Sequence, residues 1–380
     1  MRKTFKYRLY PTAKQKKSLQ LFLDACRWAY NKTLKVRKQA WEERKESISR
    51  YDTSNLLTRW KKENPELDNA YSQCLQNVTM RVDLAFRSFF RRVKIGEKPG
   101  YPRFKSFDRY DSFTFPQSGF AFVDDRLKLS KIGSVKIVKH RGIEGTIKTL
   151  TIRRTADKWY ACFSVEYNNN PLPKSDNAIG IDVGLENFAT FSNQSKIENP
   201  RFFKTGQKAL AKAQRKLSKQ TKGTPERKKA KKVVARIYER ISNKRHNFIH
   251  QESRKIINKY GTICIEKLNI KGMMSNQTKF FGNKLNKSIA DVAWSQFANV
   301  LSQKAEEAAR QFVAIDPKGT SQRCSQCGSI VKKELSDRWH DCPICGCHLH
   351  RDYNASLNIL SLGLQTLGLA PRSSRIYSEE

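Results

Sequence analysis

The chain has 380 residues, 38% of them apolar, which is enough for two or three domains with buried cores. Its 74 lysine and arginine residues outnumber 35 aspartate and glutamate residues, giving a formal net charge of +39. Such a charge opposes a compact fold unless a polyanion neutralises it, which favours nucleic acid as a partner; a membrane is disfavoured because no stretch approaches about 20 consecutive apolar residues.

The start of the chain and its cysteines both indicate a cytoplasmic protein. The basic first residues, Met1 to Lys6, have no apolar run behind them, so we expect no signal peptide. Four of the nine cysteines form two Cys-x-x-Cys pairs, and the odd total with scattered spacing argues against a disulfide framework. We therefore expect a soluble, intracellular protein with no membrane partner.

A strand and a long helix are predicted at the start. Residues 3–10 alternate apolar and polar side chains, as in a strand, and Pro11 ends the alternation. Thr12 and Gln15 form a capping-box pattern, and the apolar residues that follow lie at helical spacing on one face.

A second helix and a loop are predicted next. The helix carries apolar residues between 75 and 89 and basic residues on its other faces; its acid Asp83 stands four residues before Arg87, where the two can pair. Residues 96–105 are a loop, because glycine and proline disfavour regular structure. Its basic and aromatic side chains suit contact with nucleic acid, and we select Tyr101, Arg103 and Lys105.

From about residue 110 to 170, apolar residues recur at every second position. Several short segments in this range read as strands, which we interpret as a small β-barrel completed by the N-terminal strand. Residues 168–175 form a linker.

A second domain begins near residue 176. Residues 178–184 are predicted as a buried strand, with 187–192 returning as a hairpin, and two further apolar runs, 263–266 and 312–315, also read as strands. Long basic helices are expected between 204 and 259, broken at 221–225. Ser288 and Asp291 fit a capping pattern that would open another helix, and the tail after about Gly368 is predicted to be disordered.

Three acidic residues stand at the edges of predicted core elements. Asp182 lies in an apolar strand beside Gly184, Glu266 ends an apolar run, and Asp352 opens a helix that Gly363 could end. A carboxylate is costly to bury unless it is paired or binds metal. Two Mg²⁺ ions held by oxygen ligands can activate water and stabilise the leaving oxygen in phosphodiester cleavage. Each acid alone could be a turn, strand-end or capping residue, but together, on so basic a chain, they favour a nuclease site.

The paired cysteines predict a zinc site. Cys324-x-x-Cys327 is followed after fourteen residues by Cys342-x-x-Cys345. Two thiolate pairs of this kind make a tetrahedral structural zinc site with no open position for chemistry. Four nearby residues could substitute as zinc ligands, but we expect that they lie close only because they share the same polar loop. They are Cys347, His340, His348 and His350.

Basic residues in the two long helices could line a nucleic-acid channel. A run of charge is usually only a solvated face, but here the acids are too few to neutralise it. The candidate contacts on these helices are Lys208, Lys212, Arg215, Lys228 and Lys232, and on the first strand they are Lys3 and Arg8.

These motifs, in their order and spacing, resemble the TnpB (OrfB-type) proteins of bacterial insertion sequences, relatives of the type V CRISPR nucleases. The resemblance runs over nearly the whole chain and rests on YRLYPT (7–12), GYPRFK (100–105), GIDVG (180–184), IEKL (265–268), TSQRCSQCG (320–328) and RDYNA (351–355).

The resemblance implies an α+β, bilobed fold in a prokaryotic cytoplasmic protein. The expected parts are a β-barrel (wedge) module at 1–11 and 106–170, a helical recognition insertion at 12–105, a RuvC-like, RNase H-type nuclease domain at 176–316 and 349–366, a zinc-binding insert at 317–348 and a disordered tail at 367–380.

The resemblance also implies a function. A guide RNA from the transposon end would direct cleavage of double-stranded DNA next to a short flanking motif. The catalytic acids, which hold Mg²⁺, would be Asp182, Glu266 and Asp352, and the zinc ligands would be the four paired cysteines. Two alternatives stay open: a nucleic-acid-binding regulator that does not cleave, and a transposase or recombinase that joins strands, although the sequence carries no separate Ser or Tyr recombinase signature.

Overall fold

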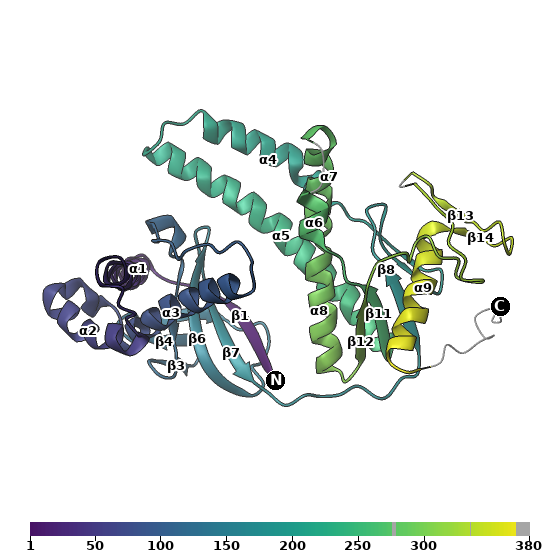
Figure 1. The fold of residues 1–380 in the computed structure, drawn as a ribbon. Helices are drawn as coiled ribbons and strands as arrows, with labels where there is room; N and C mark the ends of the chain where they lie inside the picture. Colours follow the sequence, from purple (N-terminus) through teal and green to yellow (C-terminus); the bar gives the residue numbers. More distant parts are fainter. Residues whose placement is uncertain (276–278, 335, 370–380) are drawn as a thin grey trace. The chain divides into compact units, whose positions relative to one another are not determined.

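The computed structural model describes residues 1–275, 279–334 and 336–369, and it divides into two compact units, Met1–Asn168 and Asn169–Glu380. Figure 1 labels their elements. Each unit has its own buried apolar core. The division falls at the start of the linker predicted at 168–175. The predicted disordered tail lies outside the described residues from 370 onward.

The first unit is built on a seven-stranded antiparallel sheet of order β2-β6-β7-β1-β5-β4-β3. The predicted first strand is present, and it buries Phe5, Tyr7 and Leu9 on one face. The strands are β1 (Arg2–Tyr10), β2 (Ser112–Phe115), β3 (Phe120–Val123), β4 (Arg126–Leu129), β5 (Gly133–Val138), β6 (Thr146–Thr155) and β7 (Lys158–Glu166).

The sheet curls so that its two edge strands share one core. The ring centroids of Phe115 in β2 and Phe120 in β3 lie 6.2 Å apart, and those of Phe122 in β3 and Phe163 in β7 lie 5.2 Å apart. Among the described strands no hydrogen-bonded pairing joins β2 to β3. The structure therefore has a curled sheet, and the closed barrel stays a prediction.

Helices α1 (Ala13–Arg44) and α3 (Ser72–Lys94) contact β2 of this sheet, whereas α2 (Arg50–Glu63) packs on α3 and on the 3₁₀ turn η1 (Pro65–Asn69). A second 3₁₀ turn is η2 (Phe107–Arg109). The predicted capping box at Thr12 and Gln15 is confirmed by reciprocal hydrogen bonds of 3.0 and 3.3 Å. The predicted ion pair between Asp83 and Arg87 is present at 2.8 Å, and Asp83 also pairs with Arg37 of α1 at 3.2 Å. Asp83 thus fixes α3 to α1.

The second unit is built on a five-stranded sheet of order β10-β9-β8-β11-β12. Strands β8 (Ala178–Asp182), β11 (Thr262–Glu266) and β12 (Gln311–Ile315) are parallel, whereas β9 (Asn187–Phe191) returns antiparallel to β8, as the predicted hairpin requires. The last strand, β10 (Lys196–Glu198), pairs antiparallel with β9.

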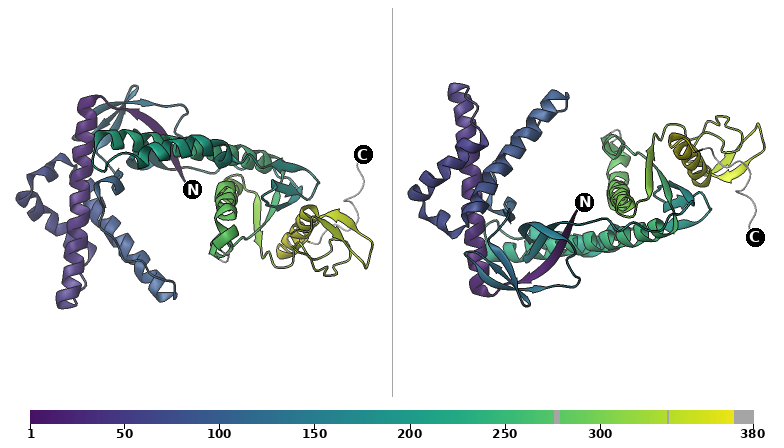
Figure 2. Two further views of the ribbon diagram at one scale, coloured as in Figure 1. Left: turned by 90° about the horizontal axis from the view of Figure 1, so that it is seen from above. Right: turned by 90° about the horizontal axis from the view of Figure 1, so that it is seen from below.

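Helices flank this sheet (Figure 1). Helix α9 (Arg351–Thr366) contacts β8, β9, β11 and β12, while α8 (Trp294–Glu307) contacts β12 and the long helix α5 (Pro225–Lys259). The predicted break at 221–225 separates α5 from α4 (Phe202–Ser218), and the two run side by side as a hairpin (Figure 2). A short helix α6 (Ile270–Ser275) precedes α7 (Lys279–Val292). No helix in the described part of the chain is long and apolar enough to cross a membrane.

The prediction of a helix opened by Ser288 is wrong. Ser288 lies inside α7, and the chain breaks instead at Ala293, whose φ of 57° separates α7 from α8. The carboxylate of Asp291 does not cap its own helix. It accepts hydrogen bonds of 3.0 and 2.9 Å from the Phe203 backbone N–H at the start of α4, and it pairs with Arg245 of α5 at 2.6 Å. Asp291 therefore makes contacts with distant helices in place of the predicted capping contact within its own helix.

Candidate active site and metal centre

Adjacent parallel strands bring two of the predicted acids together. Asp182 is the last residue of β8 and Glu266 is the last residue of β11. In the register of this pair Ile181 lies opposite Ile265, so the two acids follow at matching positions and share a face. Because the carboxyl ends of parallel strands meet at one edge, both carboxylates lie at the same end of the sheet.

Helix α9 supplies the third acid, and close packing sets its position. A Cβ added to Gly180 of β8 would lie 2.1 Å from the Ser356 carbonyl of α9, so only glycine permits this approach. A Cβ on Gly184 would lie 4.0 Å from Asp352 Oδ2. Asp352 is therefore at the same end of the sheet as Asp182 and Glu266, on the face that α9 covers.

The structure shows where α9 ends, which differs from the prediction, and which residue caps its start. The helix continues to Thr366 through Gly363, where a Cβ would lie 2.2 Å from the Cys264 sulfur of β11; this glycine serves packing and does not end the helix. Asp352 is not the N-cap, because His350 takes that position and its ring accepts from the Asp352 backbone N–H at 3.3 Å.

Burial raises the pKa values of two acids, and like charges raise one of them further. Burial has the largest effect on Asp182, and the neighbouring carboxylates of Glu266 and Asp352 raise its pKa further, well above its usual range, while Arg351 opposes this shift. Burial also raises the pKa of Glu266, against a hydrogen bond from Thr320. The oxygens of the three acids do not form a cluster within 4.8 Å in the described residues. Oxygen donors that repel one another fit a hard divalent cation, which would neutralise them.

Three polar side chains near the acids have no predicted role: Thr320 and Asn354, which stand in the family motifs, and Asn358, which stands outside them. Thr320 donates its hydroxyl to Glu266 Oε1. Asn354 and Asn358, one helical turn apart on α9, are buried and hydrogen bond to the segment before the first cysteine pair. The sequence offered one signal for the asparagines, which is their spacing of four residues on one face of the predicted helix.

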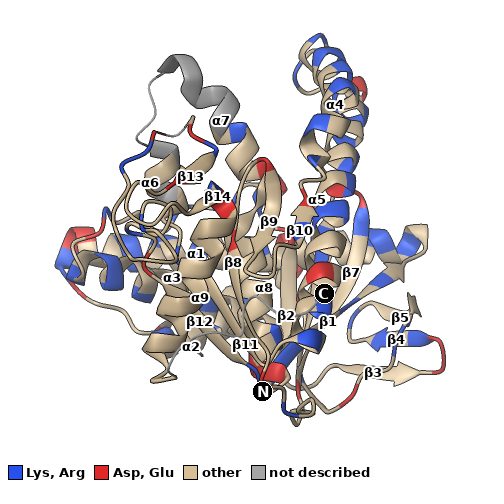
Figure 3. Ribbon diagram, turned by 90° about the vertical axis from the view of Figure 1, so that its right-hand side faces the viewer, with Lys and Arg blue, Asp and Glu red and all other residues tan. Residues whose placement is uncertain are grey.

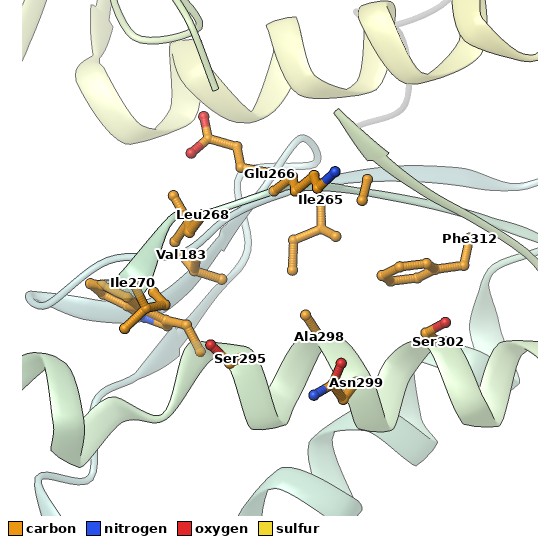
Figure 4. A pocket seen from close by; sticks show the side chains of 13 residues that line it. Val183, Ile265, Glu266, Leu268, Ile270, Ser295, Ala298, Asn299, Ser302 and Phe312 are labelled. Carbon is orange, nitrogen blue, oxygen red and sulfur yellow. The ribbon is translucent and has the colours of Figure 1, made fainter. Parts of the chain in front are cut away.

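A pocket of about 270 Å³ lies behind Glu266, between β11 and α8 (Figure 4). Ile265, Ala298 and Phe312 form much of its wall. The Glu266 carboxylate points away from these apolar side chains. The pocket is therefore separate from the face on which the acids meet.

Four cysteine sulfurs converge after β12. The ligand atoms of Cys324, Cys327, Cys342 and Cys345 all lie within 4.8 Å of one another. The Sγ–Sγ distances are 3.6 Å from Cys324 to Cys345 and 3.5 Å from Cys327 to Cys342. A zinc ion with Zn–S bonds of about 2.3 Å needs tetrahedral edges of about 3.8 Å, and a disulfide would need about 2.05 Å. The cluster therefore fits zinc.

Two matching turns hold the sulfurs. Gly328 N–H donates to the Cys324 carbonyl at 3.0 Å, and Gly346 N–H donates to the Cys342 carbonyl at 2.9 Å. Both glycines have positive φ, 78° and 70°, which a residue with a Cβ rarely adopts. Strands β13 (Trp339–Asp341) and β14 (His348–His350) pair antiparallel on either side of the second turn. Cys347 packs beside Cys324 and Cys342 but is not among the four clustered ligands.

The predicted nucleic-acid contacts of the second unit lie on the α4–α5 hairpin. Figure 3 shows lysine and arginine along α4. On α4, positions 208, 212 and 215 share one face by helical spacing, and positions 228 and 232 do so on α5. All five side chains are exposed: Lys208, Lys212, Arg215, Lys228 and Lys232.

In the first unit the predicted contacts occupy two places. Lys3 and Arg8 project from β1 and lie against aromatic rings, Lys3 over Tyr167 at 5.4 Å and Arg8 over Tyr160 at 5.2 Å. The predicted loop carries Tyr101, Arg103 and Lys105, and the Lys105 backbone is tied to Asn31 of α1 by hydrogen bonds of 2.8 and 3.0 Å. Basic and aromatic groups thus stand together at both places, and their contact with nucleic acid stays a prediction.

Three protein-family models match the chain. One described as "Probable transposase" covers residues 162–277, one described as "Cas12f1-like, TNB domain" covers 294–359, and one described as "Helix-turn-helix domain" covers 1–46. The second match includes the four clustered cysteines. In the structure the third covers β1 and the single helix α1, so it holds no second helix.

Relatives match over almost the full length. A Streptomyces pristinaespiralis protein named "Putative RNA-guided DNA endonuclease" is 33% identical over 96% of this chain and 90% of its own length. The InsQ protein of Escherichia coli K12, with the same description, is 28% identical over 99% of this chain and 96% of its own length.

A solved structure shares the mixed α+β fold. It is the Cas12f1–sgRNA–target DNA complex, which matches with a TM-score of 0.59 at 16% identity over 94% of this chain and 98% of that chain.

Proposed function

The chain belongs to the TnpB (OrfB-type) family, and from this premise we propose that it is a transposon-associated RNA-guided DNA endonuclease that hydrolyses phosphodiester bonds next to a short flanking motif. The observation that carries the proposal is the meeting of Asp182, Glu266 and Asp352 at one end of the sheet in the second unit.

This sheet is the core of a RuvC-like nuclease domain in our proposal. Its catalytic residues are Asp182, Glu266 and Asp352, which would hold Mg²⁺. When bound, the metal supplies an activated water and stabilises the leaving oxygen. The chain's own part is to collect three carboxylates at one place. Burial disfavours the ionised forms of Asp182 and Glu266, and the neighbouring carboxylates add to this effect on Asp182, so a bound cation would offset a cost that a proton otherwise offsets. Arg351, 3.6 Å from Asp352, balances part of this negative charge.

The finer domain division is also proposed. The β module comprises 1–11 and 106–170, the recognition helices 12–105, the nuclease domain 176–316 and 349–366, and the insert 317–348. The knuckle geometry of the cysteines supports structural zinc in the insert, with no open position for the reaction.

Guide RNA from the transposon end and double-stranded target DNA are the proposed partners. The exposed basic face of α4 and α5 and the basic, aromatic groups of β1 and the 101–105 loop would contact phosphates and bases. Base pairing with the guide would supply sequence specificity, while the protein reads only the flanking motif and duplex shape.

The proposal is tested by purifying the protein from cells that also carry its flanking DNA and sequencing the RNA that comes with it. The complex is then given Mg²⁺ and a plasmid library with matching targets behind random flanks. We expect one bound RNA species and cleavage only of plasmids that match its end. Bound RNA without cleavage would favour a regulator, and joined strands would favour a transposase.

The Asp182→Ala variant separates cleavage from binding. Asp182 ends β8, whereas the basic residues that we propose bind RNA are exposed on α4 and α5, so we expect cleavage to disappear while guide RNA binding stays close to wild type. Full activity in this variant would overturn the site assignment.

A further inference from the structure

A chain of hydrogen bonds joins the acids to the zinc-binding insert. Thr320, only 3% exposed, donates its hydroxyl to Glu266 Oε1. Its carbonyl accepts from Asn358 Nδ2 at 2.8 Å, and the same amide donates to the Arg323 carbonyl at 2.7 Å. Thr320 therefore contacts one proposed catalytic acid through its side chain and the helix of another through its backbone.

Asn354 continues this chain toward the cysteines. It is fully buried, donates to the Arg323 carbonyl at 2.8 Å and accepts from the Ser325 N–H at 2.9 Å. Ser325 follows the zinc ligand Cys324, and Asn354 lies two residues after Asp352. The segment 320–325 is thus fixed to α9 at the end that carries Asp352, while its first residue holds Glu266.

The hydroxyl of Thr320 has one proton and two acceptors within reach, Glu266 Oε1 and the Pro317 carbonyl at 3.1 Å. An ionised carboxylate is the stronger acceptor, so the proton goes to Glu266 whenever that acid is charged. The bond orients the carboxylate through Oε1 and leaves Oε2 for a cation.

We propose that Thr320 is a positioning residue for divalent metal binding: its hydroxyl holds Glu266, and the amides of Asn354 and Asn358 hold Thr320's segment against the helix of Asp352. The inference rests on the proposed function only for identifying the acids as a metal site. Groups that orient a ligating carboxylate commonly change metal affinity or activity by about 10–100-fold when removed.

The test is a Mn²⁺ titration followed by the electron paramagnetic resonance signal of the free ion, on zinc-loaded protein without nucleic acid. Bound Mn²⁺ reduces this signal, and the part of the reduction that is absent in Asp182→Ala is assigned to binding at the acids. Thr320→Val keeps the shape of the side chain but cannot donate, and it is expected to weaken this binding about tenfold or more. Thr320→Ser keeps the hydroxyl and should restore wild-type binding.

Controls separate positioning from folding. Thr366→Val removes a hydroxyl that donates within α9, to the Leu362 carbonyl at 2.8 Å, and should leave Mn²⁺ binding unchanged. Zinc content is measured in every variant and should stay as in wild type. If Thr320→Val loses zinc, Thr320→Ala is used in its place; zinc loss from both would assign Thr320 to the folding of the insert and overturn the inference.

Two other results would also overturn it: a Thr320→Val variant that binds Mn²⁺ like wild type, or a Thr320→Ser variant as weak as Thr320→Val. Because no nucleic acid is present, the outcome is independent of guided cleavage. A wild-type protein that binds Mn²⁺ at the acids but cuts no guided target would overturn the proposed function and leave this inference standing.

Discussion

Asp182 combines burial with two neighbouring carboxylates, Glu266 and Asp352, so its ionised form is held at a cost to the fold. Its raised pKa means that the folded chain binds a proton more tightly than the unfolded chain does. Stability from this group is therefore present at low pH and is lost as pH rises through the raised pKa. A bound cation removes the cost, which is how a site can favour function over stability.

Replacing Asp182 by Asn should abolish cleavage and, without added divalent ion, raise the melting temperature at pH 7. A gain of about 1 kcal/mol would correspond to about 2–4 °C in a unit of this size. The gain should shrink as the pH is lowered toward 4, where the wild-type carboxyl is protonated. Thermal melts from pH 4 to 8, on protein that retains its zinc, would measure this. A lower melting temperature for the variant at pH 7 would contradict the electrostatic argument.

Cys324 contributes to stability separately, through the zinc that the insert is predicted to bind. Replacing it by Ser should release zinc and lower the melting temperature of the second unit, because structural zinc contributes folding free energy. Elemental analysis and thermal melts measure both effects. Cys162→Ser, in β7 of the first unit and outside the cluster, is the matched control and should keep the zinc. Unchanged zinc content in Cys324→Ser would remove that residue from the ligand set.

At the scale of elements, close packing of α9 on the sheet places Asp352. Gly180 of β8 and Gly363 of α9 each leave no room for a Cβ, which would lie 2.1 and 2.2 Å from its nearest neighbour. The helix therefore lies against β8 and β11 at a fixed depth, with its N-terminal end beside the ends of those strands.

Gly180→Ala should lower the free energy of unfolding of the second unit by about 1–3 kcal/mol, the usual cost of overpacking, and should reduce cleavage because α9 must shift. Urea unfolding followed by circular dichroism measures the first effect. Gly142→Ala is the matched control, because nothing lies within 4 Å of the added Cβ and its φ is not positive. Equal unfolding curves for Gly180→Ala and wild type would show that the helix can move without cost.

At the scale of the whole molecule, the 35 acidic residues leave a net charge of +39 on a chain with 74 basic residues, so guide RNA should contribute to stability as well as to specificity. The exposed basic face of α4 gives this charge a defined position in the second unit.

Replacing Lys208, Lys212 and Arg215 together by Gln should weaken guide RNA binding and reduce the slope of log affinity against log salt by about two, at about 0.7 per lost phosphate contact. Filter binding between low and high salt measures the slope. The control replaces Lys208 and Lys212 by Arg and Arg215 by Lys, which keeps the charge and should keep the slope. A slope unchanged by the Gln substitutions would place RNA binding elsewhere.

The sequence by itself determined the strands that end in Asp182 and Glu266, the helix that carries Asp352, the capping box at Thr12 and the cysteine spacing, because each depends on local periodicity or on a short motif. Tertiary structure alone decided which end of the sheet collects the acids and that Gly363 packs against Cys264 instead of ending α9. It also decided that Asp291 contacts the start of α4 and does not cap its own helix, and that Thr320 contacts Glu266. These contacts join residues far apart in the chain, and no local pattern encodes the register and packing that bring them together.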